Sequence, residues 1–132
     1  MFEIETEVKL HDTDAAGIVF FANHFKIAHS AYEAFMKGID CSLDHVIRES
    51  DYLIPIVHAE ADYKGALSLG DKCSISMRAD VGTTSFTLFY AFTDTNGNVA
   101  AQVQTVHVTV EKGTGEKISL PEKLRAGLLT IS

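Results

Sequence analysis

The sequence predicts an α+β domain in which one long helix packs against an antiparallel sheet of about five strands. Three observations predict it: strict apolar–polar alternation over residues 2–10, an amphipathic pattern over residues 23–38, and a β-rich remainder broken by short turns. The chain has 132 residues, 46% of them hydrophobic, and shows neither a repeat nor a linker. We therefore expect a single domain over residues 1–132.

The first element is a half-buried strand. Alternation over residues 2–10 predicts that Phe2, Ile4, Val8 and Leu10 share the buried face. Residues 11–17 then break the alternation with Asp, Thr and Gly, which is typical of a loop.

The long helix is predicted between Asn23 as its N-cap and Gly38 as the C′ residue. Apolar side chains recur there at steps of three and four, a pattern that predicts a broad face packed on a sheet. They are Phe25, Ala28, Tyr32, Phe35 and Met36. A second, short helix is expected over residues 42–49, with Ser42 as its cap.

The remaining elements are mostly strands. We expect them at residues 52–64, 72–81, 85–94 and 98–110. Asn96-Gly97 predicts a type I′ hairpin between the last two. Pro121 favours the first turn of a C-terminal helix.

Composition excludes several classes of partner. The net charge is −7 and no run of Lys and Arg occurs, so nucleic acid and anionic membrane are poor partners. No apolar run approaches the roughly 18 residues of a membrane span. The acidic, alternating N-terminus is unlike a signal peptide, so a cytoplasmic location is expected.

Metal and disulfide chemistry are not expected. Cys41 and Cys73 stand far apart and form no C-x-x-C pair, so reduced thiols are expected. The histidines form neither H-x-H nor H-E-x-x-H, so no metal site is predicted.

The segment from His11 to Phe21 holds the candidate chemistry. Asp12 and Asp14 stand two residues apart in the loop that precedes the long helix. A carboxylate there can act as base or nucleophile while the positive end of the helix polarises a carbonyl. The alternative is that both aspartates are ordinary turn residues, and we keep that structural interpretation for Asp12.

Two blocks of sequence resemble a known family. Asp12-Thr13-Asp14-Ala15-Ala16-Gly17-Ile18-Val19-Phe20-Phe21 followed by His29-Ser30-Ala31-Tyr32-Glu33 resembles the hotdog-fold acyl-CoA thioesterases of the 4-hydroxybenzoyl-CoA thioesterase type. Ile54-Pro55-Ile56-Val57-His58-Ala59 is most similar to the 1,4-dihydroxy-2-naphthoyl-CoA hydrolases of quinone biosynthesis. The resemblance implies a hotdog fold, with the long helix wrapped by the sheet.

The resemblance also implies residue roles. Asp14 matches the catalytic carboxylate, Gly17 allows the tight turn after it, and the backbone N–H of Phe21 matches the donor to the thioester oxygen. Thr84 and Ser85 match a loop that contacts the nucleotide end of coenzyme A. The basic cluster expected just before that serine is missing, and Lys64, Lys72 and Arg78 are candidate substitutes on sequence grounds.

Other side chains are candidates for the acyl pocket or for competing roles. His24, His29 and His58 can hydrogen-bond a hydroxylated aromatic acyl group, and Tyr32 can face it. The alternative for each is a structural core or surface residue. Glu33 offers a second carboxylate, since other hotdog thioesterases use a helix glutamate. A surface pair with His29 is the favoured interpretation.

The predicted function is hydrolysis of an acyl-CoA thioester, with 1,4-dihydroxy-2-naphthoyl-CoA as the favoured substrate. The alternatives are a 4-hydroxybenzoyl-CoA or broad-range acyl-CoA thioesterase and a non-hydrolytic acyl-CoA binding module. No cofactor is expected, because coenzyme A is part of the substrate. The resemblance implies a homodimer joined through its sheet edges, assembling into a homotetramer with sites at the subunit interface.

Overall fold

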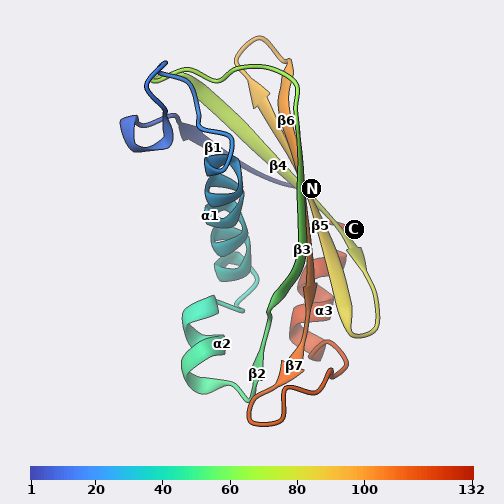
Figure 1. Cartoon of the computed structure of the whole chain (residues 1–132). Coiled ribbons are helices and arrows are strands. Elements are labelled where there is room, and N and C mark those ends of the chain that lie inside the picture. Colours follow the sequence, from blue (N-terminus) through green and yellow to red (C-terminus); the bar gives the residue numbers. More distant parts are fainter.

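The computed structural model describes residues 1–132, and its main feature is a five-stranded antiparallel sheet with a long helix on one face (Figure 1). The elements are β1 (Phe2–Glu7), a 3-10 turn (Leu10–Asp12), α1 (Asn23–Gly38), α2 (Leu43–Glu49), β2 (Tyr52–Leu53), β3 (Ile56–Tyr63), β4 (Lys72–Val81), β5 (Ser85–Asp94), β6 (Val99–Val108), β7 (Val110–Glu111) and α3 (Glu122–Leu129). The sheet order is β1-β4-β5-β6-β3. The predicted α+β class and five-stranded sheet are confirmed.

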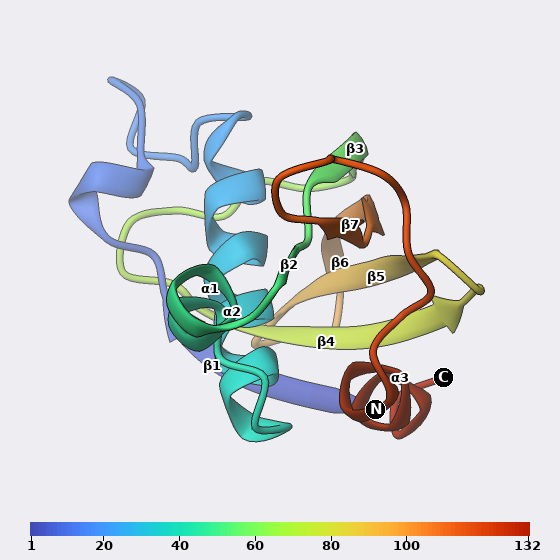
Figure 2. The same cartoon turned by 90° about the horizontal axis from the view of Figure 1, so that it is seen from below.

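The core lies between α1 and the sheet. Alternate residues of β4 and β5 point to α1, and Met77, Leu88 and Phe92 among them are fully enclosed. The predicted helical face supplies Ala28, Tyr32, Phe35 and Met36 from the other side. Figure 2 shows α1 on one side of the sheet and α3 beside β4, to which the chain end is tied by the Ala79 N–H donating to Ile131 O (3.0 Å).

Both ends of the long helix differ from the prediction. Asn23 is the first helical residue instead of the N-cap, and its side-chain amide donates to the Asp12 carbonyl (2.9 Å). The residue before the helix, Ala22, makes no side-chain cap. Gly38 is still helical, and Asp40 adopts the left-handed conformation with φ 65°. Asn and Gly are favoured at helix caps, which is why the sequence predicted them there. In the structure the Asn23 side chain instead bonds the Asp12 carbonyl, and the last turn of α1 continues through Gly38.

The predicted strands at 52–64 and 98–110 are each interrupted. The first splits before Pro55 into β2 and β3, and the second ends at Val108 before β7. β2 and β7 form a separate two-stranded sheet. Proline cannot donate to a ladder, so the chain leaves one sheet and joins the other there.

Two local predictions are wrong. Leu10 is exposed, because the chain enters a 3-10 turn after β1 instead of continuing the strand. The turn between β5 and β6 is not type I′, since Gly97 has φ 83° but Asn96 does not have a positive φ. Asp94 Oδ1 accepts from both the Asn96 and Asn98 N–H groups (2.9 Å each), which supports a longer turn.

β3 forms one edge of the five-stranded sheet. It pairs with β6 on one side, and its other side has no strand partner. Val57 is 58% exposed and Tyr63 is 47% exposed. An apolar edge strand with an unpaired backbone is a natural surface for pairing with another strand.

Candidate active site

The loop before α1 is organised by the buried carboxylate of Asp12. Its Oδ2 accepts the Lys9 N–H (2.9 Å), and its backbone carbonyl accepts the Phe20 N–H (3.0 Å) and the Asn23 side chain. These contacts fold residues 12–20 back on themselves and join them to the helix. The structural interpretation of Asp12 is thereby confirmed.

Asp14 lies at the tip of this folded segment and is exposed. Its Oδ1 accepts the Ala16 N–H (2.8 Å), and its carbonyl accepts the Gly17 N–H (3.0 Å). Gly17 has φ 77°, a conformation that glycine adopts at little cost. No ion pair engages Asp14, so Oδ2 stays free at the surface.

The N-terminal end of α1 offers a free backbone donor at Phe21. The carbonyl of the same peptide unit, Phe20 O, accepts the Asn23 N–H (2.8 Å), while the Phe21 N–H donates to no acceptor in the protein. The side chain of Phe21 is 62% exposed and packs against Phe20 at 4.7 Å between ring centroids. A carboxylate oxygen and an N–H at a helix start, both unpartnered, are therefore carried by one segment.

His24 belongs to the first turn of α1, and its side chain is almost completely buried. Its Nδ1 is 3.2 Å from the carbonyl of Phe21, and the Tyr63 hydroxyl donates to the same carbonyl (2.7 Å). Burial lowers the pKa of His24 below its ordinary value. The structure thus places the predicted substrate residue His24 against the backbone next to the donor.

Tyr32 lies on the buried face of α1, in a polar cluster within the core. Its hydroxyl is buried without a hydrogen-bond partner, and its ring is 4.7 Å from that of His107. His107 Nε2 is 2.8 Å from Thr105 Oγ1, and its ring stacks on Phe86. Burial lowers the pKa of His107 to about 4. Sequence reasoning missed His107, which lies on the buried face of β6.

The remaining histidine candidates lie on the surface. His29 and Glu33 form the expected i,i+4 pair (3.4 Å), and both are well exposed. His58 pairs with Glu60 (3.2 Å) on β3. Strand alternation places Ala59 and Tyr63 on the α1 side, so His58 faces away from the helix and does not converge with Asp14 in one protomer.

The turn before β5 carries Thr84 and Ser85. The Gly82 N–H donates to Ser85 O (2.8 Å), and a Cβ at residue 82 would lie 2.9 Å from that oxygen, so glycine is required. Arg125 of α3 donates to the Gly82 carbonyl. Sequence reasoning missed this basic side chain, because the contact spans 43 residues and no local pattern indicates it.

The candidate substitutes for the missing basic cluster lie elsewhere. Lys64 follows β3 and is exposed, and Lys72 stands opposite Glu7 in the β1–β4 ladder. Arg78 lies on the sheet face away from α1, where its guanidinium is 4.4 Å from the centre of the Phe89 ring. None of them is at the Thr84–Ser85 turn.

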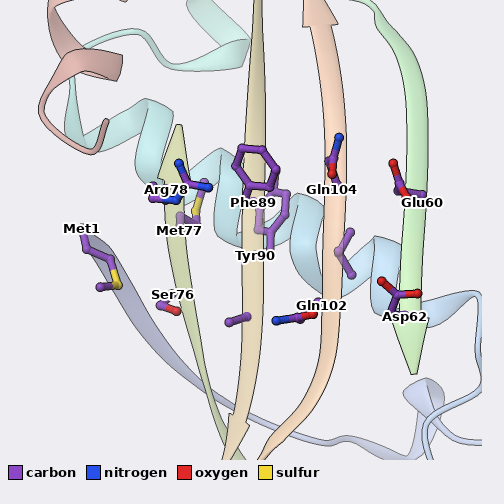
Figure 3. A pocket seen from close by; sticks show the side chains of 12 residues that line it. Met1, Glu60, Asp62, Ser76, Met77, Arg78, Phe89, Tyr90, Gln102 and Gln104 are labelled. Atoms are coloured by element: carbon purple, nitrogen blue, oxygen red, sulfur yellow. The ribbon is translucent and has the colours of Figure 1, made fainter. Parts of the chain in front are cut away.

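Two of the hollows that lie apart from Asp14 have apolar side chains in their walls. One, of about 380 Å³, lies on the sheet face away from α1, with Glu60 and Asp62 at one side and Arg78 at the other (Figure 3). The other, of about 440 Å³, is mostly apolar, and its wall includes His29 and Tyr32. Neither contains Asp14, Gly17 or Phe21. The structure brings no three metal-ligating side chains together, and none of its helices has the length and hydropathy to span a bilayer.

Comparison with known proteins decides the family. The model of the thioesterase-like superfamily matches residues 8–128. The chain belongs to the thioesterase-like superfamily. The resemblance found in the sequence is thereby confirmed, and the folded segment around Asp14 lies within the matched region.

Individual members of the thioesterase-like superfamily are similar over nearly the whole chain. A 1,4-dihydroxy-2-naphthoyl-CoA hydrolase of Synechococcus elongatus is 33% identical and covers 94% of this chain and 92% of its own length. One from Rippkaea orientalis is 35% identical, covering 89% and 87%. The crystal structure of a 1,4-dihydroxy-2-naphthoyl-CoA thioesterase from Synechocystis superposes with a TM-score of 0.93 at 28% identity, covering 97% and 95%. The hotdog fold is confirmed.

Proposed function

We propose that this chain hydrolyses an aromatic hydroxyacyl-CoA thioester, with 1,4-dihydroxy-2-naphthoyl-CoA as its favoured substrate. The observation that carries the proposal is the pairing of a free Asp14 carboxylate oxygen and a free Phe21 N–H on one segment. The names of the similar hydrolases support thioester hydrolysis and this acyl group.

The chemistry needs few groups. A thioester lacks much of the resonance stabilisation of an ester, so one carboxylate and one polarising donor suffice. Asp14 either attacks the carbonyl carbon, releasing the coenzyme A thiolate and forming an anhydride that water then hydrolyses to the free acid and the regenerated carboxylate, or takes a proton from a water that attacks the carbonyl and displaces the thiolate directly. In both routes the Phe21 N–H and the positive end of α1 stabilise the oxyanion. One such donor is typically worth about 2.7–4 kcal/mol.

The surface next to Asp14 suits an aromatic acyl group. Phe20 and Phe21 expose their rings there, and Leu69, whose N–H donates to Gly17 O (2.9 Å), is also exposed. An aromatic acyl group would bury this apolar surface while its carbonyl meets the helix start. At the other end of the substrate, Thr84 and Ser85 with the nearby Arg125 offer hydroxyl and guanidinium groups to phosphate.

A homodimer assembling into a homotetramer is part of the proposal. The unpaired edge of β3, with its exposed Ile56, Val57 and Tyr63, supports antiparallel pairing with the same strand of a second copy. On the outer sheet face, Glu60 and Asp62 lie at one side and Arg78 at the other, which supports face-to-face pairing of two dimers (Figure 3). The cytoplasmic location stays a prediction.

A thiol-release assay over a panel of acyl-CoA thioesters tests the function. The panel contains 1,4-dihydroxy-2-naphthoyl-CoA, 4-hydroxybenzoyl-CoA and straight-chain acyl-CoAs. We expect the highest kcat/KM for the first. A preference for straight chains would favour the broad-range alternative. Tight binding with no thiol released would identify a binding module and contradict the proposal.

A further inference from the structure

The carbonyl of Phe21 is the meeting point of two donors from different elements. The Tyr63 hydroxyl, at the end of β3, donates to it at 2.7 Å, and His24 Nδ1 lies 3.2 Å away. We propose that Tyr63, assisted by His24, is a positioning residue that fixes the Phe21 peptide so that its free N–H points to the reacting carbonyl.

The helix start needs such support because it has no cap of its own. Ala22 precedes the helix and offers no side-chain acceptor to the first N–H groups. Phe20 O accepts the Asn23 N–H (2.8 Å), which fixes the peptide unit before Phe21. The Tyr63 bond fixes the peptide unit after it. With both units held, the orientation of the Phe21 N–H is determined.

The aromatic rings hold the same geometry. The Tyr63 ring meets the Phe21 ring edge-on, at 6.4 Å and 88°, and the His24 ring at 4.8 Å and 70°. His24 also contacts Phe92 of the central sheet (5.7 Å). In its neutral form with the proton on Nδ1, His24 donates to Phe21 O, and its enclosure favours the neutral form.

Tyr63 also connects the site to the sheet edge. It is the last residue of β3, the strand that the proposed dimer pairs with its copy. A shift of β3 moves the hydroxyl relative to the helix start, so pairing of the edge strands orders the donor as well as joining the subunits. This role of Tyr63 rests on the function proposed above.

The test removes the hydroxyl alone. In Tyr63→Phe we expect kcat to fall about tenfold, because a donor misplaced by a fraction of an ångström loses much of its effect. KM should stay within about twofold, since binding of the ground state changes little. Tyr52→Phe is the matched control. It removes a hydroxyl that makes no hydrogen bond, and its kcat should equal that of the wild type.

His24 provides a rescue experiment. In His24→Asn the side-chain amide nitrogen takes a place similar to Nδ1 and can donate to Phe21 O. His24→Leu fills the space without a donor. We expect Asn to retain most of kcat and Leu to lose it. Equal loss in both variants at unchanged Tm would contradict a positioning role.

An activity-independent readout separates this inference from the proposed function. Loss of the hydrogen bond to Phe21 O should shift the Ala22 amide resonance, which belongs to the same peptide unit, and speed hydrogen exchange at Asn23. Suppose that the wild type hydrolyses no thioester, yet the Ala22 and Asn23 amide signals change in Tyr63→Phe. The proposed function is then wrong, while the role of Tyr63 in fixing the Phe21 carbonyl is supported. If the wild type is active and Tyr63→Phe changes neither kcat nor the amides, the inference is overturned.

Discussion

Polar groups gather in two regions of this molecule, and the two regions differ in how far their side chains are exposed to solvent. Residues 12–21 present an exposed carboxylate at Asp14 and an unpartnered backbone N–H at Phe21, the two groups proposed for the reaction. The cluster of Tyr32, Tyr90, Thr105 and His107 is buried under α1. Burial moves the pKa of His107 to about 4 and raises that of the Tyr32 hydroxyl. In this cluster the pKa shifts follow from burial, whereas the groups proposed for the reaction, Asp14 and the Phe21 N–H, lie where substrate can reach them.

The largest expected effect lies in the exposed segment. Asp14→Asn should lower kcat by about 10³-fold or more, because the amide is neither a base nor a nucleophile. The Asn oxygen can still accept the Ala16 N–H, so Tm should not change. Steady-state kinetics and thermal unfolding measure the two. Hydrolysis at the wild-type rate would refute the mechanism.

The next effect lies in the buried cluster and concerns stability. The pKa of His107 is lowered from 6.5 to about 4 in the folded protein, so between these values the unfolded chain binds the proton and the folded chain does not. The neutral His107 therefore leaves the free energy of unfolding undiminished above pH 6.5, and this free energy decreases as the pH falls from 6.5 toward 4. The loss in unfolding free energy should approach about 3 kcal/mol.

Urea unfolding between pH 7 and pH 4 measures this loss, and His107→Gln isolates it. The glutamine side chain of this variant does not bind a proton in this range, so the free energy of unfolding of the variant should fall less steeply between pH 7 and pH 4. Parallel curves for the two proteins would show that His107 is not the group responsible. Turnover at pH 7 should be far less sensitive to this substitution than to Asp14→Asn.

The smallest effect is expected at the second carboxylate. Glu33 lies on the exposed side of α1 in a surface pair with His29. Glu33→Gln should cost less than about 0.5 kcal/mol of stability and leave kcat within about twofold. A large fall in kcat for Glu33→Gln, measured in the same assay as Asp14→Asn, would instead indicate that Glu33 on α1 is the catalytic carboxylate.

Local pattern was sufficient to predict the elements and the candidate segment. Alternation over residues 2–10 located β1 and its half-buried face, and the spacing of apolar residues located α1. Loop composition and resemblance together indicated Asp14. These features depend on residues close in sequence, or on periods that one element repeats.

The missed features depend on contacts between distant parts of the chain. Tyr63 reaches Phe21 across 42 residues, and Arg125 reaches Gly82 across 43. Asn23 was predicted as the N-cap but is the first residue of α1, because its side-chain amide donates to the Asp12 carbonyl instead of capping the helix. No local pattern encodes such pairings, since they exist only after the sheet and helix have packed.

The order of strands in the sheet has a consequence for how the protein folds. β4, β5 and β6 are sequential neighbours joined by short turns, so they can pair early at little entropic cost. β1 and β3 come from earlier in the chain and add to the two outer edges of this meander. Asp14 follows β1, and Tyr63 ends β3. We therefore expect the segment that carries Asp14 and its contact with Tyr63 to assemble in the last steps of folding, so that a chain folded only through its meander lacks the proposed active site.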